Sequence, residues 1–299
     1  MTDHAHTHEA EEDARNETIL IHVNGRIVPK AEAMVSVYDA GFMLGDGIWE
    51  GIRLYDGRWA FLDEHVERLF EGCLAIDLAI GLTPDQVKQA LIDLQHANGM
   101  TTDAHARLMV TRGVKTRPFQ HPRLSQQGPT IAIIMEHSRP RLPRPIRLAT
   151  VPHLRGLPMT QDPRLNSHSK LNCILACIAA EKAGADEALM LDVHGFVNTT
   201  NACNVFIVRR GEIWTSTGDY CMNGITRGKV LSLARANGIT AREKNFSLVD
   251  VYSADEMFLT GTFGAQTPVG MVDGRPIGTG RIGPVTERIR ALYRALVAA

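Results

Sequence analysis

Lys170 is the residue of this sequence whose setting most favours covalent chemistry. It stands alone between Lys115 and Lys182, with the polar run 166–169 before it and an apolar segment after it. The apolar residues recur at helical spacing, which predicts that Lys170 lies at the mouth of a buried helix. An amine that loses hydration there has a lowered pKa and becomes a better nucleophile. That is the environment of a lysine that attacks carbonyl groups. The alternative is an ordinary lysine near a helix start, with its amine in water.

Two glycine-containing turns predict a site for an anion. NGITRGK leads into a helix, so the backbone amides of Ile225 and Thr226 would point outward from the positive end of that helix. The triplet TGT, which ends at Thr262, adds hydroxyl and backbone donors after a strand. Arg68 could add a guanidinium that donates hydrogen bonds to two oxygens of the anion. Each feature alone is also typical of an ordinary helix cap or turn. No P-loop or GxGxxG motif competes for the role.

The composition is typical of a soluble globular protein with two domains. The chain has 299 residues, of which 44% are hydrophobic and 22% charged. A net charge of −1 and the lack of a basic run argue against a general nucleic-acid binder. No apolar run reaches transmembrane length, and the polar start does not resemble a signal peptide. An odd number of cysteines, five, favours reduced thiols in the cytoplasm, and no Cys/His set has the spacing of a metal site.

The hydrophobic patterning predicts an α/β (α+β) protein made of four segments. Residues 1–17 are acidic, carry three histidines and lack an apolar period, which predicts a disordered tail. Residues 18–137 combine alternating strands with two amphipathic helices and form a small α/β domain. The proline-rich stretch 138–146 is expected to be a stiff linker. Residues 147–299 form a larger domain that is rich in strands.

Several segments, taken together and in order, resemble the class IV aminotransferases, the pyridoxal-phosphate (PLP) proteins of fold type IV. The resemblance runs from about Ile19 to the C-terminus, and its best segments are VYDAGFMLGDGIWEGIRLYDG, FLDEHVERL, VTRG, NGITRGKVLSLARANGI, ADEMFLTGT and TPVGMVDGRPIGTGRIGP. It implies a two-domain fold type IV enzyme that uses pyridoxal 5'-phosphate. GIRLYDG is more like the branched-chain group, and VTRGVKTRP is more like the D-amino-acid group.

The activity that the resemblance implies is transamination. An aliphatic, branched-chain amino acid would give its amino group to a 2-oxo acid. The alternatives are a D-amino-acid or amine transaminase, and a PLP-dependent lyase of the aminodeoxychorismate-lyase type. The resemblance also implies a homodimer, and the long polar loop at 115–128 is consistent with a pocket that a neighbouring chain completes. No nucleic-acid or membrane partner is expected.

The resemblance also implies roles for single residues that hold the cofactor. Lys170 would be the covalent lysine. Arg68 matches the phosphate-binding arginine of the HxxR motif. The backbone at Ile225 and Thr226 matches the phosphate cup of the family, and Thr262 matches the hydroxyl of that cup.

Three further residues match positions around the substrate. Trp49 falls where the family places an aromatic side chain that lines the pocket. Arg107 matches an arginine near the substrate of branched-chain enzymes, and Arg117 matches the carboxylate-binding arginine of D-amino-acid enzymes. Phe42 and Phe263, together with Trp49, could supply apolar walls that favour branched aliphatic side chains.

Two positions depart from the family pattern. Counted without gaps, the lysine position of the family falls on Asn166, so either the segment is shorter by about one helical turn or the covalent lysine has moved to Lys170. Thr199 stands where the family has a glutamate that keeps the pyridine nitrogen protonated. A threonine can hydrogen-bond that nitrogen but cannot neutralise a pyridinium charge, which would weaken the electron sink. This favours a lyase as the alternative. The retained Arg68, Thr262 and Lys170 argue against a non-catalytic descendant.

Overall fold

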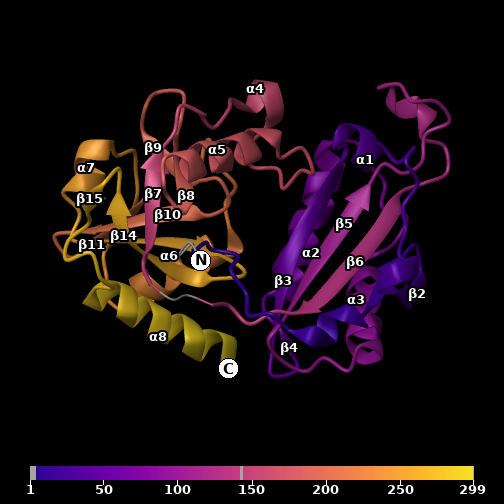
Figure 1. The fold of residues 1–299 in the computed structure, drawn as a ribbon, viewed down its shortest axis with the longest axis horizontal. Helices are drawn as coiled ribbons and strands as arrows, with labels where there is room; N and C mark the ends of the chain where they lie inside the picture. The colour runs from indigo at the N-terminus through magenta and orange to yellow at the C-terminus, as the bar shows by residue number, and fades with distance from the viewer. Residues whose placement is uncertain (1–4, 142–143, 299) are drawn as a thin grey trace. The chain divides into compact units, whose positions relative to one another are not determined.

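The computed structural model describes residues 5–141 and 144–298 and divides into two compact units (Figure 1). The small unit comprises residues 10–139 and 165–170, and the large unit comprises residues 1–9, 140–164 and 171–299. The boundary at 139/140 falls inside the predicted linker 138–146, of which residues 142–143 lie outside the described part. The sequence did not predict that the segment 1–9 belongs to the large unit and the segment 165–170 to the small unit.

The small unit is built on a six-stranded antiparallel sheet with strand order β2-β1-β6-β5-β3-β4. Its strands are β1 (Leu20–Val23), β2 (Arg26–Pro29), β3 (Gly47–Tyr55), β4 (Arg58–Trp59), β5 (Ala104–Thr111) and β6 (Thr130–His137). Its helices are α1 (Ala40–Leu44), α2 (Leu62–Ala75) and α3 (Pro84–Ala97), with short 3-10 turns at η1 (Ala14–Glu17), η2 (Lys30–Glu32) and η3 (Pro122–Leu124).

The core of the small unit lies between the sheet and the helices α2 and α3. Strand periodicity puts Ile48, Ile52 and Leu54 of β3 on one face, where they pack against Leu69 of α2. Figure 1 shows α2 running along β3. Helix α3 begins at Pro84, where Thr83 forms a capping box with Gln86. This packing fixes which side chains of β3 face the core and which face the other way.

The large unit contains a nine-stranded sheet that closes on itself. Its strands are β7 (Ile146–Thr150), β8 (Glu187–Leu191), β9 (Val197–Thr200), β10 (Asn204–Arg209), β11 (Glu212–Thr215), β12 (Ala241–Glu243), β13 (Glu256–Gly261), β14 (Ala265–Val272) and β15 (Arg275–Pro276). Pairing follows the order β12-β11-β10-β13-β14-β7-β8-β9, and Thr199 of β9 pairs with Asn204 of β10. Six strands therefore form a barrel, and its closure lies at this one residue pair.

The large unit also contains helices, some of which cover the outside of this barrel. They are α4 (Pro158–Gln161), α5 (Leu171–Lys182), α6 (Ile225–Ala236), α7 (Leu248–Tyr252) and α8 (Pro284–Ala298). Helix α5 packs on Ala188 and Met190 of β8, while α6 and α8 pack on Phe206 of β10 and Phe258 of β13. Alternate residues such as Val205 and Leu259 point into the barrel core instead.

The N-terminal segment differs from the predicted disordered tail. Residues 5–17 are placed, and Ala5 and Thr7 are buried in the large unit. The amide and hydroxyl of Thr7 both donate to the buried Glu187, and the amide of Ala5 donates to Asp186. Carboxylates at the start of β8 thus satisfy donors of a segment that has no apolar pattern of its own, so the prediction was wrong for residues 5–17. Residues 1–4 lie outside the described part.

Helix α5 is present as predicted, but its apolar side is not buried. Within α5 only Ala176 and Ala180 are buried, and they face the barrel. The larger residues form an exposed stripe at helical spacing, consisting of Leu171, Ile174, Leu175 and Ile178. The prediction of a buried helix after Lys170 is therefore wrong for this chain taken alone. No helix in the described residues is long and apolar enough to cross a bilayer.

Candidate active site

The segment that carries Lys170 is attached to the edge of β3. The backbone N–H of Trp49 donates to the carbonyl of Asn166 at 3.0 Å, and the N–H of His168 donates to the carbonyl of Gly47 at 2.9 Å. The Ser169 hydroxyl donates to the carbonyl of Gly45 at 3.1 Å. The pairing adds a short antiparallel stretch to a sheet edge that would otherwise leave backbone groups unsatisfied. It places Lys170 in the small unit, one residue before α5.

Trp49, Arg107 and Lys170 form a cluster on the face of β3 opposite the core. Gly51 pairs with Arg107 in the β3–β5 ladder, so Arg107 shares a face with Trp49. The Arg107 guanidinium carbon lies 3.9 Å from the centre of the Trp49 ring, and Lys170 Nζ lies 5.7 Å from it. Burial lowers the pKa of Arg107, although it remains charged at neutral pH. Among the described residues no carboxylate pairs with Arg107, so the cluster can accept an anion beside an aromatic wall and an amine.

His168 belongs to the same cluster and was not predicted. A Cβ on Gly47 would touch its ring, and its Nε2 is buried without a hydrogen-bond partner in the described residues. Burial, followed by the charges of Arg107 and Lys170, lowers the pKa of His168, so the imidazole is neutral at pH 7. The sequence signal that could have found it was its position two residues before Lys170 in a polar run.

Arg68 lies on the other face of β3. Its Nε and Nη2 donate to the two carboxylate oxygens of Glu50 at 2.8 and 2.7 Å, and His65 Nδ1 lies 2.7 Å from Glu50 Oε2. Trp49 and Glu50 are consecutive in a strand, so they point to opposite faces. Within the small unit, the structure therefore does not bring Arg68 together with Trp49. The predicted phosphate contact of Arg68 remains a prediction.

Arg117 stays outside the cluster. It is exposed in the loop between β5 and β6, and none of the described contacts of Trp49 involves it. Phe42 is 71% exposed on α1, so it does not form a wall in the described chain. Phe263 is buried in the large unit, where the ring of His8 stacks on it with a centroid distance of 6.1 Å.

In the large unit, four buried polar residues form a row across neighbouring strands. Thr199 pairs with Asn204, Asn204 with Thr260, and Thr260 with Gln266. Paired residues point to the same side of a sheet, and Met190, the partner of Thr199 on β8, packs against α5. The row therefore lies on the outer face of the barrel, the face that α5 and α6 cover.

The row adjoins the predicted phosphate cup at Asn204. The Nδ2 of Asn204 donates to the carbonyl of Met222 at 2.9 Å, and a Cβ on Gly224 would collide with its Oδ1. Gly224 is the N-cap of α6, so the free amides of Ile225 and Thr226 start beside Asn204. Thr262 lies in the turn that follows Thr260. The structure thus brings Thr199 and the start of α6, with Ile225 and Thr226, to a shared neighbour, Asn204, that the sequence had not indicated.

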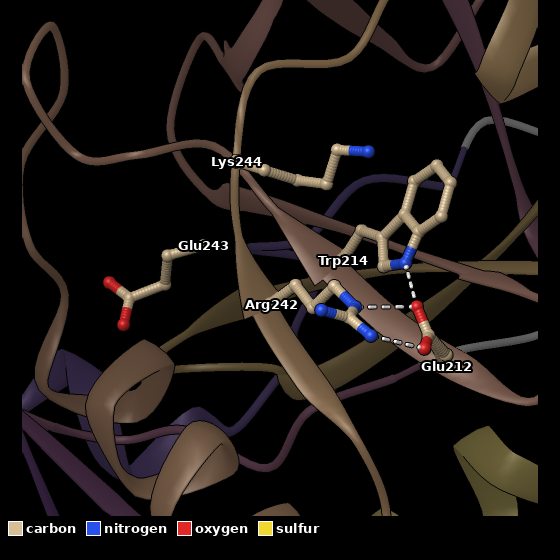
Figure 2. A pocket seen from close by; sticks show the side chains of 5 residues that line it. All are labelled: Glu212, Trp214, Arg242, Glu243 and Lys244. Atoms are coloured by element: carbon tan, nitrogen blue, oxygen red, sulfur yellow. Dashed lines mark hydrogen bonds and ion pairs between the residues drawn. The ribbon is translucent and has the colours of Figure 1, made fainter.

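A surface cavity of about 550 Å³ lies elsewhere on the large unit (Figure 2). Its charged groups already have partners: Glu212 pairs with Arg242, and Lys244 Nζ lies 4.0 Å from the centre of the Trp214 ring. Figure 2 shows the Trp214 indole and Arg242 both pointing toward Glu212. Trp214 alternates with Thr215, the residue that pairs with Phe206 on the outer face of the barrel. The cavity therefore opens on the other face of the sheet, away from the polar row.

The sequence matches the family model described as amino-transferase class IV over residues 47–271. The chain therefore belongs to the class IV aminotransferases, which depend on PLP.

Curated relatives carry two kinds of name. The chain is 37% identical to "Branched-chain-amino-acid aminotransferase-like protein 2" of Arabidopsis thaliana over 94% of its length, but this is 51% of that relative. The chain thus spans about half the length of the Arabidopsis relatives it matches. A putative branched-chain-amino-acid aminotransferase of Methanocaldococcus jannaschii is 37% identical, over 92% of this chain and 95% of its own. D-alanine aminotransferases of Listeria match 91% of the chain at lower identity.

A solved structure gives the same fold. A T.th. branched-chain amino acid aminotransferase with pyridoxamine 5'-phosphate superposes with a TM-score of 0.88, at 31% identity, over 94% of each chain.

The residues of the large unit fit a phosphate-bearing cofactor. Helix α6 presents free amides, Thr226 is buried at its first turn, and a Cβ at position 224 would displace the Asn204 side chain. The Thr260 hydroxyl beside them is buried without a partner among the described residues, which is the condition of a group that a ligand or water completes. Among the described residues no group of three His, Cys, Asp or Glu side chains could hold a metal ion.

Proposed function

We propose that this protein is a PLP-dependent transaminase that moves an amino group between a branched-chain amino acid and a 2-oxo acid. The observation that carries the proposal is the Trp49 cluster. It holds an amine at Lys170, a desolvated guanidinium at Arg107 and an apolar ring within one small region. A transaminase of aliphatic amino acids requires these three groups: an amine that binds the cofactor and moves the proton, a cation for carboxylate, and an apolar wall.

The proposed roles follow the match to the family. PLP, when bound, supplies an aldehyde that condenses with amines and a ring that withdraws electrons. The amides of Ile225 and Thr226 and the hydroxyl of Thr262 would bind its phosphate. Lys170 would hold and release the cofactor through its amine. Thr199 would face the pyridine nitrogen of the cofactor, and its hydroxyl donates to the carbonyl of Thr200 at 2.7 Å.

Arg107 is the proposed anchor of the substrate carboxylate. Its guanidinium stacks on the Trp49 ring, which holds the guanidinium plane in one orientation. The N–H groups at the edge of that plane can still donate hydrogen bonds to a carboxylate. Trp49 would then contact the aliphatic side chain. Arg68 is proposed as a further phosphate ligand, with Glu50 holding its guanidinium in place.

We also propose that the protein works as a homodimer in the cytoplasm. The exposed stripe of α5 is an apolar surface of the kind that subunit interfaces bury. All five cysteines are unpaired, which suits a reducing compartment.

The test is a transamination assay of the PLP-loaded protein. L-leucine, D-alanine and a chiral primary amine are each incubated with 2-oxoglutarate, and the new oxo product is measured. The proposal expects turnover with L-leucine at least tenfold above that with D-alanine or the amine. Faster turnover of D-alanine would favour the second candidate, a D-amino-acid transaminase, to which the Listeria relatives point. No turnover of any donor would contradict the proposed activity.

A further inference from the structure

Thr260 and Gln266 are two neighbouring buried side chains whose polar atoms remain unsatisfied. Each is 2% exposed, and they pair in the β13–β14 ladder. Neither Thr260 Oγ1 nor Gln266 Nε2 has a hydrogen-bond partner in the described residues. Directly opposed residues of a ladder have Cβ atoms about 5 Å apart on the same face. One small group could therefore contact both.

The other two members of the polar row are satisfied within the protein. Asn204 donates to the carbonyl of Met222 and lies 3.7 Å from Cys221 Sγ, and Thr199 donates to the carbonyl of Thr200. The unsatisfied half of the row is thus the half on β13 and β14. These two strands are joined by the turn that contains Thr262.

An unsatisfied buried amide donor carries a free-energy cost, because it gives up its hydrogen bonds with water and gains none in return. Gln266 stands at the second position of β14, where an apolar side chain would remove that cost. A polar side chain at this place is explained if something outside the chain accepts its hydrogen bond. An oxygen of an anion in the adjoining cup would do so, because the cup also lacks its acceptor.

We propose that Gln266 and Thr260 form a positioning pair for the phosphate group that the cup binds. The Gln266 side-chain N–H donates to a phosphate oxygen, directly or through one water that the Thr260 hydroxyl also holds. This deepens the proposed function and rests on it, because the phosphate is that of the cofactor. The pair extends the cup from the α6 amides across to β14.

The pair is tested by binding to the apoprotein, with no turnover needed. Dissociation constants are measured for inorganic phosphate, PLP and pyridoxal, which lacks the phosphate. In Gln266→Leu, the constants for inorganic phosphate and PLP should rise about tenfold, since a hydrogen bond to a charged group is lost. The constant for pyridoxal should stay within twofold of wild type. Thr260→Val should raise the same two constants. In the double variant they should rise by less than the product of the two single-variant factors, because the two residues contact the same group.

The matched control is Gln95→Leu, which removes a buried glutamine of the small unit whose amide donates to the carbonyl of Met100. It should leave all three constants unchanged. If Gln266→Leu lowers thermal stability yet binds phosphate and PLP as wild type does, the pair serves packing alone and the inference is overturned. A wild-type protein that binds neither phosphate nor PLP would overturn the proposed function as well, whereas normal wild-type binding isolates the failure to this pair.

Discussion

At the scale of single residues, Glu50 organises the core-facing side of β3. Its carboxylate lies between His65 and Arg68 and is almost completely buried. Burial alone would raise its pKa, but the hydrogen bonds from His65 and Arg68 outweigh burial and hold the pKa of Glu50 below its usual value. The spacing of three residues puts His65 and Arg68 on one face of α2. Nothing in the sequence indicated their common partner, because a glutamate within a strand is usually solvated.

Glu50→Gln should therefore destabilise the protein by about 1.5–3 kcal/mol at pH 7, because the half-buried Arg68 guanidinium loses its hydrogen bonds to the Glu50 carboxylate. A lowered pKa in the folded state gives stability that is present above the unfolded pKa of about 4.3 and is lost as the pH falls through the lower folded value. Wild type should lose this contribution below about pH 4, and the variant should lack that part of the pH dependence. The free energy of unfolding of wild type and variant, measured with urea at pH 7 and below about pH 4, tests this. Glu67→Gln, on the exposed side of α2, is the control, and equal effects of the two variants would contradict the account.

Arg107 and Arg117 give a second test at this scale. Arg107→Met removes the stacked, desolvated guanidinium and should raise KM for an amino-acid donor at least tenfold, or about 1.4 kcal/mol of binding. Arg117→Met removes an exposed loop arginine and should change KM less than twofold. Steady-state kinetics with L-leucine decide between them. The reverse pattern would support the D-amino-acid geometry, and no effect of either would refute a carboxylate anchor on this face.

At the scale of elements, the sequence predicted the helices and strands better than their surroundings. Strand β3 lies in the region where alternating strands were expected, and α2 and α3 are the two amphipathic helices expected there. Helix α6 follows from its glycine turn. The exposure of α5 could not be predicted, because apolar residues at i, i+3, i+4 and i+7 have the same pattern whether the face meets the core of its own chain or a partner. The docking of Thr7 on Glu187 was missed, because it depends on hydrogen bonds between distant residues.

Helix α6 offers a prediction with a control in the same helix. Gly224→Ala places a methyl group against Asn204 Oδ1 and should displace the first turn of α6, raising the dissociation constant of PLP at least tenfold. At Gly228, exposed within α6, an added Cβ meets nothing within 4 Å. Gly228→Ala should stabilise the protein by about 0.5–1 kcal/mol and leave PLP binding unchanged. Equal PLP affinities in both variants would show that the cup does not need the close approach at Gly224.

At the scale of the whole molecule, the two-domain organisation was predicted, but not the exchange of segments. The sequence placed one boundary in the proline-rich stretch, where the described units also divide. It could not place residues 165–170 in the small unit, because that assignment rests on backbone pairing with the edge of β3. Barrel closure at Thr199 and Asn204 could likewise not be predicted from the sequence, since it depends on one pair of residues on different strands. Of the candidate site, the resemblance indicated the residues of the cup and of the Trp49 cluster, whose roles stay predictions, and the structure added Asn204 and His168 as their neighbours.

The α5 stripe predicts how copies of the chain assemble. Wild type should sediment as a dimer, and the double variant Ile174→Lys, Ile178→Lys should sediment as a monomer, because it places two charges in the apolar interface. Leu74→Lys, at an 80% exposed residue of α2 in the small unit, should remain dimeric. Sedimentation velocity over a dilution series measures all three. A wild-type protein that is monomeric at every concentration and still active would contradict this assembly.

The account as a whole depends on one covalent link between the protein and its cofactor, which reductive trapping measures directly. The PLP-loaded protein is treated with borohydride, digested, and the peptides are mapped by mass spectrometry. The account predicts a phosphopyridoxyl group on Lys170 and on no other lysine, and loss of that label together with the visible absorbance of the bound cofactor in Lys170→Ala. Label on Lys182 or Lys229 instead, or no label on a protein that retains PLP, would contradict it.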